Sequence, residues 1–435
     1  MTTILTDVSS SQTIIKAIAA CILACLFCFS PTHSPSSAQD TDFSPHTLFQ
    51  QIHAIEADAL TLGWTAGRLQ EVGDLWEQAG QIEHAVAYWE RAVTIEPDVD
   101  LLQRLTLAYI NGQMFDTALA TLGQIQQLAP NNNWAIYYTA LILAPIQPEE
   151  ALSYAHDLLL HDTYGHTMQD LYSILNSERP HIYILSDVAA LYADRRLWPL
   201  AEYAFQYAAE QYAPFPDALA YTALMRAMQG KDSTERLHEA IELAPESSTI
   251  RMIAGIERRI NQDYEASLSA LLQAVVLEPT NPVIYHELNL TYTNLGQTDS
   301  AENAEFVSHL LAGTIDAEGN DISDGNAPTL YIPGIGITET ALQSLSNLVE
   351  AKPEDQWLRA IYGWALLELG RVEGGITLIE AAWNANTNDE RVGMIAAQAY
   401  MATGQLADAS TLLTTIANSD TPYAEVAGAI LGIPR

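Results

Sequence analysis

Three histidines at five-residue intervals suggest a metal site, because imidazole nitrogens are common zinc ligands. They are His156, His161 and His166. A step of five residues turns a helix by about 140°, so successive side chains leave different sides and cannot share one ion. Gly165 favours a loop here, and the chain lacks the His-Glu-x-x-His zinc motif. We therefore expect ordinary loop and surface histidines and no metal site.

A second group of candidate ligands lies in an acidic segment whose carboxylate and amide oxygens suit calcium. It comprises Asp316, Glu318, Asn320, Asp321, Ser323 and Asp324. An EF-hand loop starting at Asp316 needs glycine at its sixth place and glutamate at its twelfth. Those places hold Asp321 and Ala327. We expect a solvated acidic linker, and a calcium- or small-ligand-binding module is the alternative.

The sequence lacks the motifs that build enzyme active sites. Gly334-Ile335-Gly336 is not followed by the other residues of a phosphate-binding loop, and no Gly-x-Ser-x-Gly nucleophile motif occurs. The only cysteines are Cys21, Cys25 and Cys28. The rest of the chain therefore has no thiol for catalysis, zinc binding or disulfides. We expect a protein that is not an enzyme and has no cofactor.

The charge of the chain limits its partners. The 435 residues include 54 acidic and 18 basic ones, which gives a net charge of -36. Such a surface repels nucleic acid and anionic lipid, so we expect neither as a partner. It attracts cations and basic segments, although solubility alone also explains the charge.

The N-terminal segment, residues 1–38, has the pattern of an export signal. Lys16 precedes an unbroken apolar run over residues 17–29, which is short for a membrane span and typical of a signal-peptide core. Small residues ending at Ala38 offer a cleavage site. We expect export to the periplasm, the cell envelope or the outside of the cell. An uncleaved anchor and a lipid on Cys21 or Cys25 are alternatives, and either would be the only link to a membrane.

The elements that carry these residues are helices with a repeated pattern of side-chain size. Between Gly73 and Pro97, small residues are Gly73, Ala85 and Ala92, and large ones are Trp76 and Trp89. Gly80 separates two apolar patterns of helical period, and Pro97 cannot continue the second helix. Small residues one and two turns apart let helices approach closely, so the pattern predicts a helical hairpin.

The same order of sizes recurs at least seven times along the chain, whereas a catalytic motif occurs once. Later copies include those around Leu105, Ala189, Gly255, Gly363 and Ala397. The pattern resembles the tetratricopeptide repeat (TPR) family, whose 34-residue unit has small residues at positions 8, 20 and 27 and proline at 32. The resemblance covers most of residues 69–416. It implies an all-α solenoid of antiparallel helix pairs, wound as a right-handed superhelix, that acts as a protein-binding scaffold.

The repeats predict two arrays. Residues 39–44 are expected to be flexible, and an N-terminal array then covers residues 45–312. Residues 313–338 are rich in Gly, Pro, Asn and Asp and indicate a linker or insertion. A C-terminal array follows over residues 339–435 and ends in a capping helix that starts at Thr421, because a terminal repeat otherwise exposes its stacking face.

Positions 2, 5, 9 and 12 of each first helix form a stripe that lines the concave, partner-binding surface in TPR proteins. The stripe begins with Gln70, Asp74, Glu77, Asp100 and Gln103, continues with Met252, Ile256, Arg259, His286 and Leu290, and ends with Trp357, Trp364, Leu367, Arg391, Met394 and Gln398. It is acidic at the start and apolar and aromatic toward the end. It lacks a Lys/Asn clamp for a terminal carboxylate, so we expect another kind of protein or peptide partner.

Trp357 and Trp364 are the strongest candidates for partner contact. They lie seven residues apart on one helix face, and exposed tryptophan beside arginine is the composition of a binding hot spot. The alternative is that the protein covers them itself, for example with the apolar end of the linker. The candidate partner-binding residues are Trp357, Trp364, Arg391, Met394, Gln398, Arg259, His286, Gln70 and Asp74.

Overall fold

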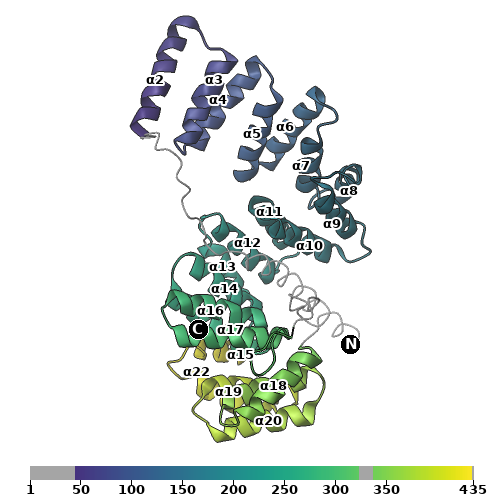
Figure 1. Ribbon diagram of the computed structural model, residues 1–435, viewed down its shortest axis with the longest axis vertical. Helices are drawn as coiled ribbons and strands as arrows, with labels where there is room; N and C mark the ends of the chain where they lie inside the picture. The colour runs from purple at the N-terminus through teal and green to yellow at the C-terminus, as the bar shows by residue number, and fades with distance from the viewer. Residues whose placement is uncertain (1–44, 323–336, 434–435) are drawn as a thin grey trace. The chain divides into compact units, whose positions relative to one another are not determined.

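The computed structural model describes residues 45–322 and 337–433. Every regular element in these two ranges is an α-helix, from α2 to α23 (Figure 1). The predicted all-α solenoid of helix pairs is confirmed for this part of the chain. Three predicted features lie outside the described residues. They are the export signal in residues 1–38, the flexible segment in residues 39–44 and the apolar end of the linker within residues 323–336. Among the described helices, none is both long enough and apolar enough to cross a membrane.

The described residues form two compact units that divide between Arg179 and Pro180. The first contains α2 (Pro45–Leu62), α3 (Ala66–Gln78), α4 (Ile82–Ile95), α5 (Val99–Asn111), α6 (Phe115–Leu128), α7 (Asn133–Leu143), α8 (Pro148–Asp157) and α9 (Gly165–Leu175). Antiparallel pairs form from α3 and α4, α5 and α6, and α7 and α8, and each pair packs on the next. The helices α2 and α9 lie before and after these three pairs in the chain.

The second unit begins at Pro180. It contains α10 (His181–Asp194), α11 (Trp198–Gln211), α12 (Pro216–Met228), α13 (Thr234–Leu243), α14 (Ser248–Ile260), α15 (Tyr264–Leu277), α16 (Pro282–Asn294), α17 (Thr298–Ala312), α18 (Glu339–Ala351), α19 (Gln356–Glu368), α20 (Val372–Ala385), α21 (Glu390–Ala402), α22 (Leu406–Ala417) and α23 (Ala424–Ile430). The capping helix α23 starts later than predicted, because the hydroxyl of Thr421 bonds to Glu390 and the chain there forms a turn.

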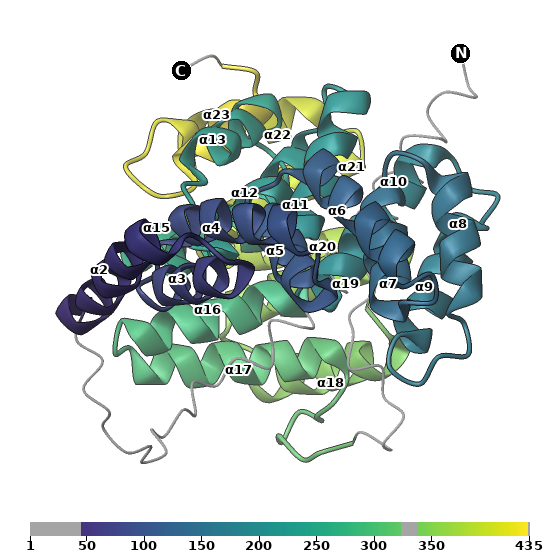
Figure 2. The ribbon, with the colours of Figure 1, turned by 90° about the horizontal axis from the view of Figure 1, so that it is seen from above.

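The predicted boundary at residues 313–338 is not where the chain divides into units. Helix α18 packs on α17 (Figure 2), and α21 packs on α15, so the helices before and after this segment belong to one unit. The segment joins neighbours within that unit. The observed division falls instead at Arg179, in the short connection between α9 and α10.

Small residues set the distance between paired helices, as the sequence pattern predicts. A Cβ atom on Gly255 would lie 2.5 Å from Leu271 Cγ, and one on Gly363 would lie 2.7 Å from Ile379 Cγ1. A Cβ on Gly73 would likewise overlap the indole of Trp89. Each of these glycines is in a first helix, and each large partner is fully or almost fully buried in the second helix of the same pair. The helices can approach only because one side chain is absent.

This packing predicts opposite effects for two alanine substitutions in the pair α19 and α20. Gly363→Ala should lower the free energy of unfolding by about 1–3 kcal/mol, because the new methyl group meets Ile379 and the backbone oxygen of Gly375 at 2.8 Å. Gly374→Ala is the matched control, since its nearest atom is 3.7 Å away. It should gain up to about 1 kcal/mol from helix propensity. Urea titrations followed by circular dichroism compare them, and a stabilised Gly363→Ala protein would contradict the packing argument.

Candidate functional site

The first unit presents the predicted stripe on the surface of α3 and α5. We call this surface the α3–α5 face; it consists of Gln70, Asp74, Glu77, Asp100, Gln103 and Leu107. Glu77, Asp100 and Leu107 are exposed, and the other three are half-buried. Leu107, on α5, is 39% exposed. A shallow depression of about 350 Å³ adjoins Gln70 and Asp74 on α3. The face is therefore accessible, acidic and partly apolar.

Asp74 connects two repeats of the first unit. Its Oδ1 lies 2.7 Å from Nη1 of Arg104 and accepts a hydrogen bond of 3.0 Å from Nε1 of buried Trp89. The Arg104 guanidinium also covers the Trp89 ring at 4.3 Å, and its Nη2 lies 2.6 Å from Glu77. The Asp74 carboxylate thus holds the next repeat in place. Glu77, whose side chain is 47% exposed, is the more accessible charge on the face.

Aromatic side chains lie on α7, where Trp134 and Tyr138 are half-buried and Tyr137 is buried. Trp134 follows Asp100 by 34 residues, so it has the same repeat position, and its ring lies 4.5 Å from that of Tyr138. Tyr137 stacks on Tyr164 at 4.6 Å. Burial raises the pKa of Tyr138 to about 12, so its hydroxyl keeps its proton at neutral pH. These residues were not predicted as site residues, although the aromatic run from Trp134 to Tyr138 in the sequence indicates them.

The protein itself covers part of the stripe at its C-terminal end, although the Arg391 side chain is 43% exposed. Met394 has no exposed surface, so its assignment to an accessible partner site is wrong. Gln398 Nε2 donates a hydrogen bond of 2.5 Å to the backbone oxygen of Val276, at the end of α15. Trp364 Nε1 donates to Glu368 at 3.0 Å, and the same carboxylate accepts from the hydroxyl of Thr280 at 2.9 Å. The cover is the turn between α15 and α16.

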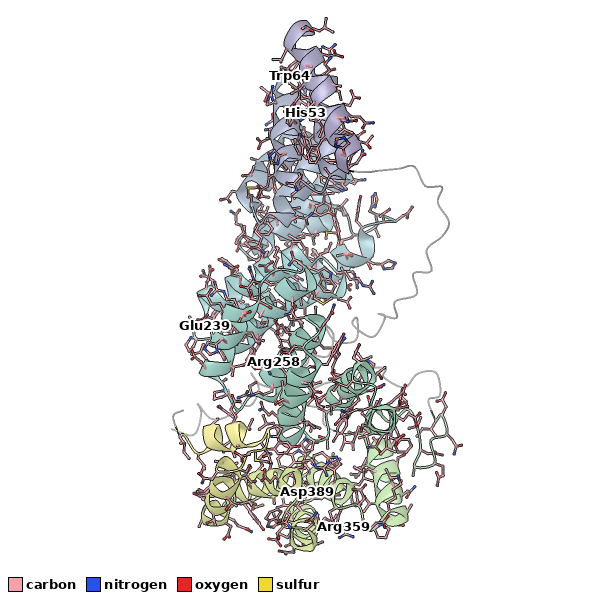
Figure 3. All side chains as sticks on the ribbon, turned by 90° about the vertical axis from the view of Figure 1, so that its left-hand side faces the viewer. His53, Trp64, Glu239, Arg258, Arg359 and Asp389 are labelled. Atoms are coloured by element: carbon pink, nitrogen blue, oxygen red, sulfur yellow. The ribbon has the colours of Figure 1, made fainter. Side chains whose placement is uncertain are left out.

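Trp357 and Arg391 also face this turn. The Arg391 guanidinium lies 5.2 Å above the Trp357 ring and donates to Asp389, labelled in Figure 3, at 3.0 and 2.8 Å. Burial raises the pKa of the Tyr285 hydroxyl, and nearby Arg391 and a hydrogen bond with Trp357 oppose the shift. Tyr285 belongs to α16. The tryptophan and arginine predicted to form a hot spot are therefore next to each other, but they contact another part of the same unit.

Arg259 and His286 have structural surroundings on α14 and α16. Arg259 Nε and Nη2 lie 3.0 and 2.7 Å from one carboxylate oxygen of Glu287. The Glu287 side chain is 2% exposed and that of Arg259 is 19% exposed. The guanidinium therefore neutralises a buried charge. His286 is mostly buried beside this ion pair.

Burial lowers the pKa of His286 below its usual value of 6.5. The charges of Arg259 and His309 lower this pKa further, whereas those of Glu287 and Glu305 raise it. The unfolded chain then binds a proton at a higher pH than the folded protein does. Stability should thus be complete above about pH 6.5 and fall as the pH is lowered toward 5. We expect His286→Gln to reduce this loss of stability. The loss is measured as the difference between the urea unfolding midpoints at the two pH values. His238→Gln, at a side chain that is 71% exposed, is the control and should leave the loss unchanged.

The three regularly spaced histidines do not form one site. His161 Nδ1 accepts from the backbone N–H of Thr163 at 3.2 Å, and its ring stacks on Tyr164 at 4.8 Å. His156 lies near Tyr172 on the neighbouring helix α9. Within the residues that the structure describes, no three histidine, cysteine or acidic side chains are grouped to hold a metal ion.

In the acidic segment, the described part forms a tight turn. Asp316 Oδ1 accepts from the backbone N–H groups of Glu318 and Asn320 at 3.0 and 2.8 Å, and Oδ2 accepts from the Asn320 side chain at 2.9 Å. The hydrogen bonds from Asn320 lower the pKa of the Asp316 carboxyl. Both oxygens of Asp316 are therefore used inside the turn. Ser323 and Asp324 lie outside the described residues.

A family model described as tetratricopeptide repeat matches residues 338–398. The helix pairs of this segment are of TPR type. The match covers α18, α19, α20 and most of α21, which includes the covered tryptophan and arginine side chains. No curated protein matches the sequence.

Solved structures with a similar helical fold share little sequence with the chain. Yeast Tom70 is 13% identical and aligns over 84% of this chain and 94% of its own, with a TM-score of 0.24. A tetratricopeptide repeat protein from Parabacteroides merdae is 14% identical over 70% and 98%, with a TM-score of 0.27. The Cut9–Hcn1 structure from the APC/C is 14% identical over 88% and 82%, with a TM-score of 0.28. These scores are too low to transfer any site.

The sequence of α15 indicates that another element packs against this helix. Most second helices are apolar along one side only; α4 buries just Ala85, Trp89 and Ala92. In contrast, α15 also buries Gln273, Val275 and Val276 on its outer side. A helix that is apolar all round is buried on more than one side. The pattern in α15 therefore predicts a covering element, but not which element covers it.

Proposed function

We propose that this protein is a non-catalytic scaffold that binds a protein or peptide through the α3–α5 face and the adjoining aromatic residues of α7. One observation carries the proposal. On α3 and α5, Glu77, Asp100 and Leu107 are exposed, whereas on α21 Met394 is fully buried and Gln398 bonds to Val276 of α15. A helix array of this type is typical of protein-interaction modules.

The composition of the face favours a partner with basic and apolar side chains. Glu77 and Asp100 are exposed and negatively charged, and the whole chain carries a net charge of -36. Opposite charge on a partner would speed its encounter with the face. Leu107 and Trp134 would then supply contact area, because aromatic and large apolar side chains carry much of the binding energy at interfaces.

Affinity capture with paired variants tests this proposal. The full chain serves as bait, and captured proteins are quantified by mass spectrometry. Leu107→Asp and Trp134→Ala should each reduce the specific partner by at least about tenfold, since loss of a hot spot costs about 2 kcal/mol or more. Leu128→Asp is the matched control, because Leu128 is also exposed, at 50%, but lies at the end of α6 outside this face. Equal recovery with all three variants would contradict the proposal.

We also propose that the chain is exported and acts in the periplasm, the cell envelope or outside the cell. Lys16 and the apolar run over residues 17–29 support this, as does the absence of cysteine after Cys28 in the sequence. N-terminal sequencing of the protein from fractionated cells should find a mature chain that starts just after Ala38. An intact N-terminus in the cytoplasmic fraction would contradict export. A lipid or an uncleaved apolar run would instead give a membrane-anchored exported form.

A further inference from the structure

A pocket of about 460 Å³ lies between α11, α12 and α13, three neighbouring helices of the second unit (Figure 1). Its volume is within the range of about 300–1,000 Å³ that is common for ligand pockets. We call it the α11–α13 pocket and define it by Ala209, Glu210, Phe215, Leu219, Glu239 and Leu243.

The α11–α13 pocket is separate from the stripe that the repeats predict as the partner-binding surface. Leu219 and Thr222 line the pocket from α12. Counted from Pro216, the first residue of this helix, they have repeat positions 4 and 7. The stripe consists of positions 2, 5, 9 and 12, so the pocket opens on another side of the repeats.

The inside of the pocket is apolar. Phe215 and Leu219 are 7% and 8% exposed, and Ala209 of α11 is also buried. Leu243, the last residue of α13, lines the pocket from the neighbouring helix and is 48% exposed. The pocket can therefore surround a large apolar side chain, and transfer of such a side chain from water is favourable.

Charged side chains line the same pocket. Glu210 of α11 is exposed, and its Oε1 accepts a hydrogen bond of 2.9 Å from Gln206, which is a neutral group. On α13, Oε2 of Glu239 (labelled in Figure 3) lies 3.3 Å from Nη1 of Arg236. These two side chains are 48% and 40% exposed, so their ion pair is weak. One arginine thus accompanies two carboxylates, and the lining has a negative net charge.

An apolar interior beside two carboxylates fits one kind of occupant. A neutral apolar molecule would use the interior alone, and an acidic one would be repelled by Glu210 and Glu239. A peptide segment with a large apolar side chain and basic neighbours would use both. Alternate side chains of an extended segment lie on the same side, so basic residues two places before and after the apolar one can approach the carboxylates of α11 and α13.

We propose that the α11–α13 pocket binds a peptide segment of a partner, with one large apolar side chain inside the pocket and a basic side chain at Glu210 or Glu239. The pocket lies in the second unit and the α3–α5 face in the first. A segment bound here would give the scaffold a second contact. Neither site depends on the other, so the two proposals can fail independently.

Three blocked pentapeptides test the proposal in calorimetric titrations of the full chain. The probe Arg-Ser-Phe-Ser-Arg should bind at least about tenfold more tightly than Arg-Ser-Ala-Ser-Arg, which has no large side chain to bury. It should also bind at least about tenfold more tightly than Glu-Ser-Phe-Ser-Glu, whose charge is repelled. An ionic strength of about 0.15 M screens charges more than about 8 Å away, so that the net charge of the whole chain contributes little.

The peptide series can overturn the proposal in three ways. Equal binding of the phenylalanine and alanine peptides would show attraction by charge alone. Equal binding of the arginine and glutamate peptides would show a simple apolar pocket. A probe that does not bind at all would show that the pocket does not accept this kind of segment.

Variants of the pocket show whether the probe binds there. Leu243→Ser should weaken probe binding at least about threefold, because it removes apolar contact. Leu406→Ser is the matched control, since Leu406 is also exposed, at 65%, but begins α22. Glu239→Gln should weaken binding about two- to fivefold, the range for an exposed ion pair. Glu242→Gln is its control on the same helix, with a side chain that is 67% exposed and does not line the pocket.

The same titrations separate the α11–α13 pocket from the α3–α5 face. Leu107→Asp should leave probe binding unchanged. If it abolished binding while Leu243→Ser had no effect, the pocket would not be the site and the function proposed for the α3–α5 face would stand. Equal losses for Glu239→Gln and Glu242→Gln would also overturn the pocket, because binding would then depend only on the total charge.

Discussion

Trp89→Ala should lower the free energy of unfolding of the first unit by about 3–5 kcal/mol, the range for deleting a large buried aromatic side chain. Trp89 is 1% exposed and fills the space left by Gly73. Its Nε1 is bonded to Asp74, and Arg104 covers its ring at 4.3 Å. The substitution would therefore leave a cavity and remove the contacts of Trp89 with Asp74 and with Arg104 of the next repeat.

Amide hydrogen exchange is the suitable measurement for Trp89→Ala, because a repeat array need not unfold in one step. Exchange should increase most in α3, α4 and α5. Trp89→Phe is the matched control, since it keeps most of the ring volume and loses only the indole N–H; we expect a cost of about 1 kcal/mol. If alanine and phenylalanine gave equal, small effects, Trp89 would not be the centre of this core.

Arg259→Met is the second change with a large expected effect. Removing one member of a buried ion pair costs about 3–5 kcal/mol, because the remaining charge stays buried without compensation. Glu287, with a side chain that is 2% exposed, would be that charge. Urea titration of the full chain should show an earlier unfolding transition for the second unit.

The double variant Arg259→Met/Glu287→Leu separates this cause from a general loss of packing. An apolar pair of similar volume is often as stable as the buried ion pair it replaces. We therefore expect the double variant to recover most of the lost stability, and the two substitutions to be strongly non-additive. If the double variant were less stable than Arg259→Met, Arg259 would be needed for something other than neutralising Glu287.

The helix pairs could be predicted from the sequence because their causes are local. Asp98 and Asn132 begin α5 and α7 by accepting hydrogen bonds from backbone N–H groups three residues further on. Gly80 has a positive φ of 74° in the turn between α3 and α4, a conformation that costs glycine little. The size of each contact residue, such as Gly363 against Ile379, then determines how closely two helices pack.

The candidate site was predicted only in part. Gln70 and Asp74 are half-buried on the α3–α5 face, where Asp74 mainly holds Trp89 and Arg104; their role in partner binding stays a prediction. The stripe pattern identified Trp357 and Arg391 as one cluster, and they do lie together. It left open whether the protein covers them, because a stripe records the repeat position of a residue and not what lies opposite.

By itself, the sequence determined an all-α chain of helix pairs with a regular pattern of small and large residues, since helical period and side-chain volume act within about 34 residues. Only the tertiary structure decided which stripes stay accessible. Contacts such as Gln398 with Val276 join residues 122 positions apart in the chain, and they depend on how small rotations add up over many repeats. No local pattern specifies that sum, so the exposed Leu107 on α5 and the buried Met394 on α21 could be told apart only in three dimensions.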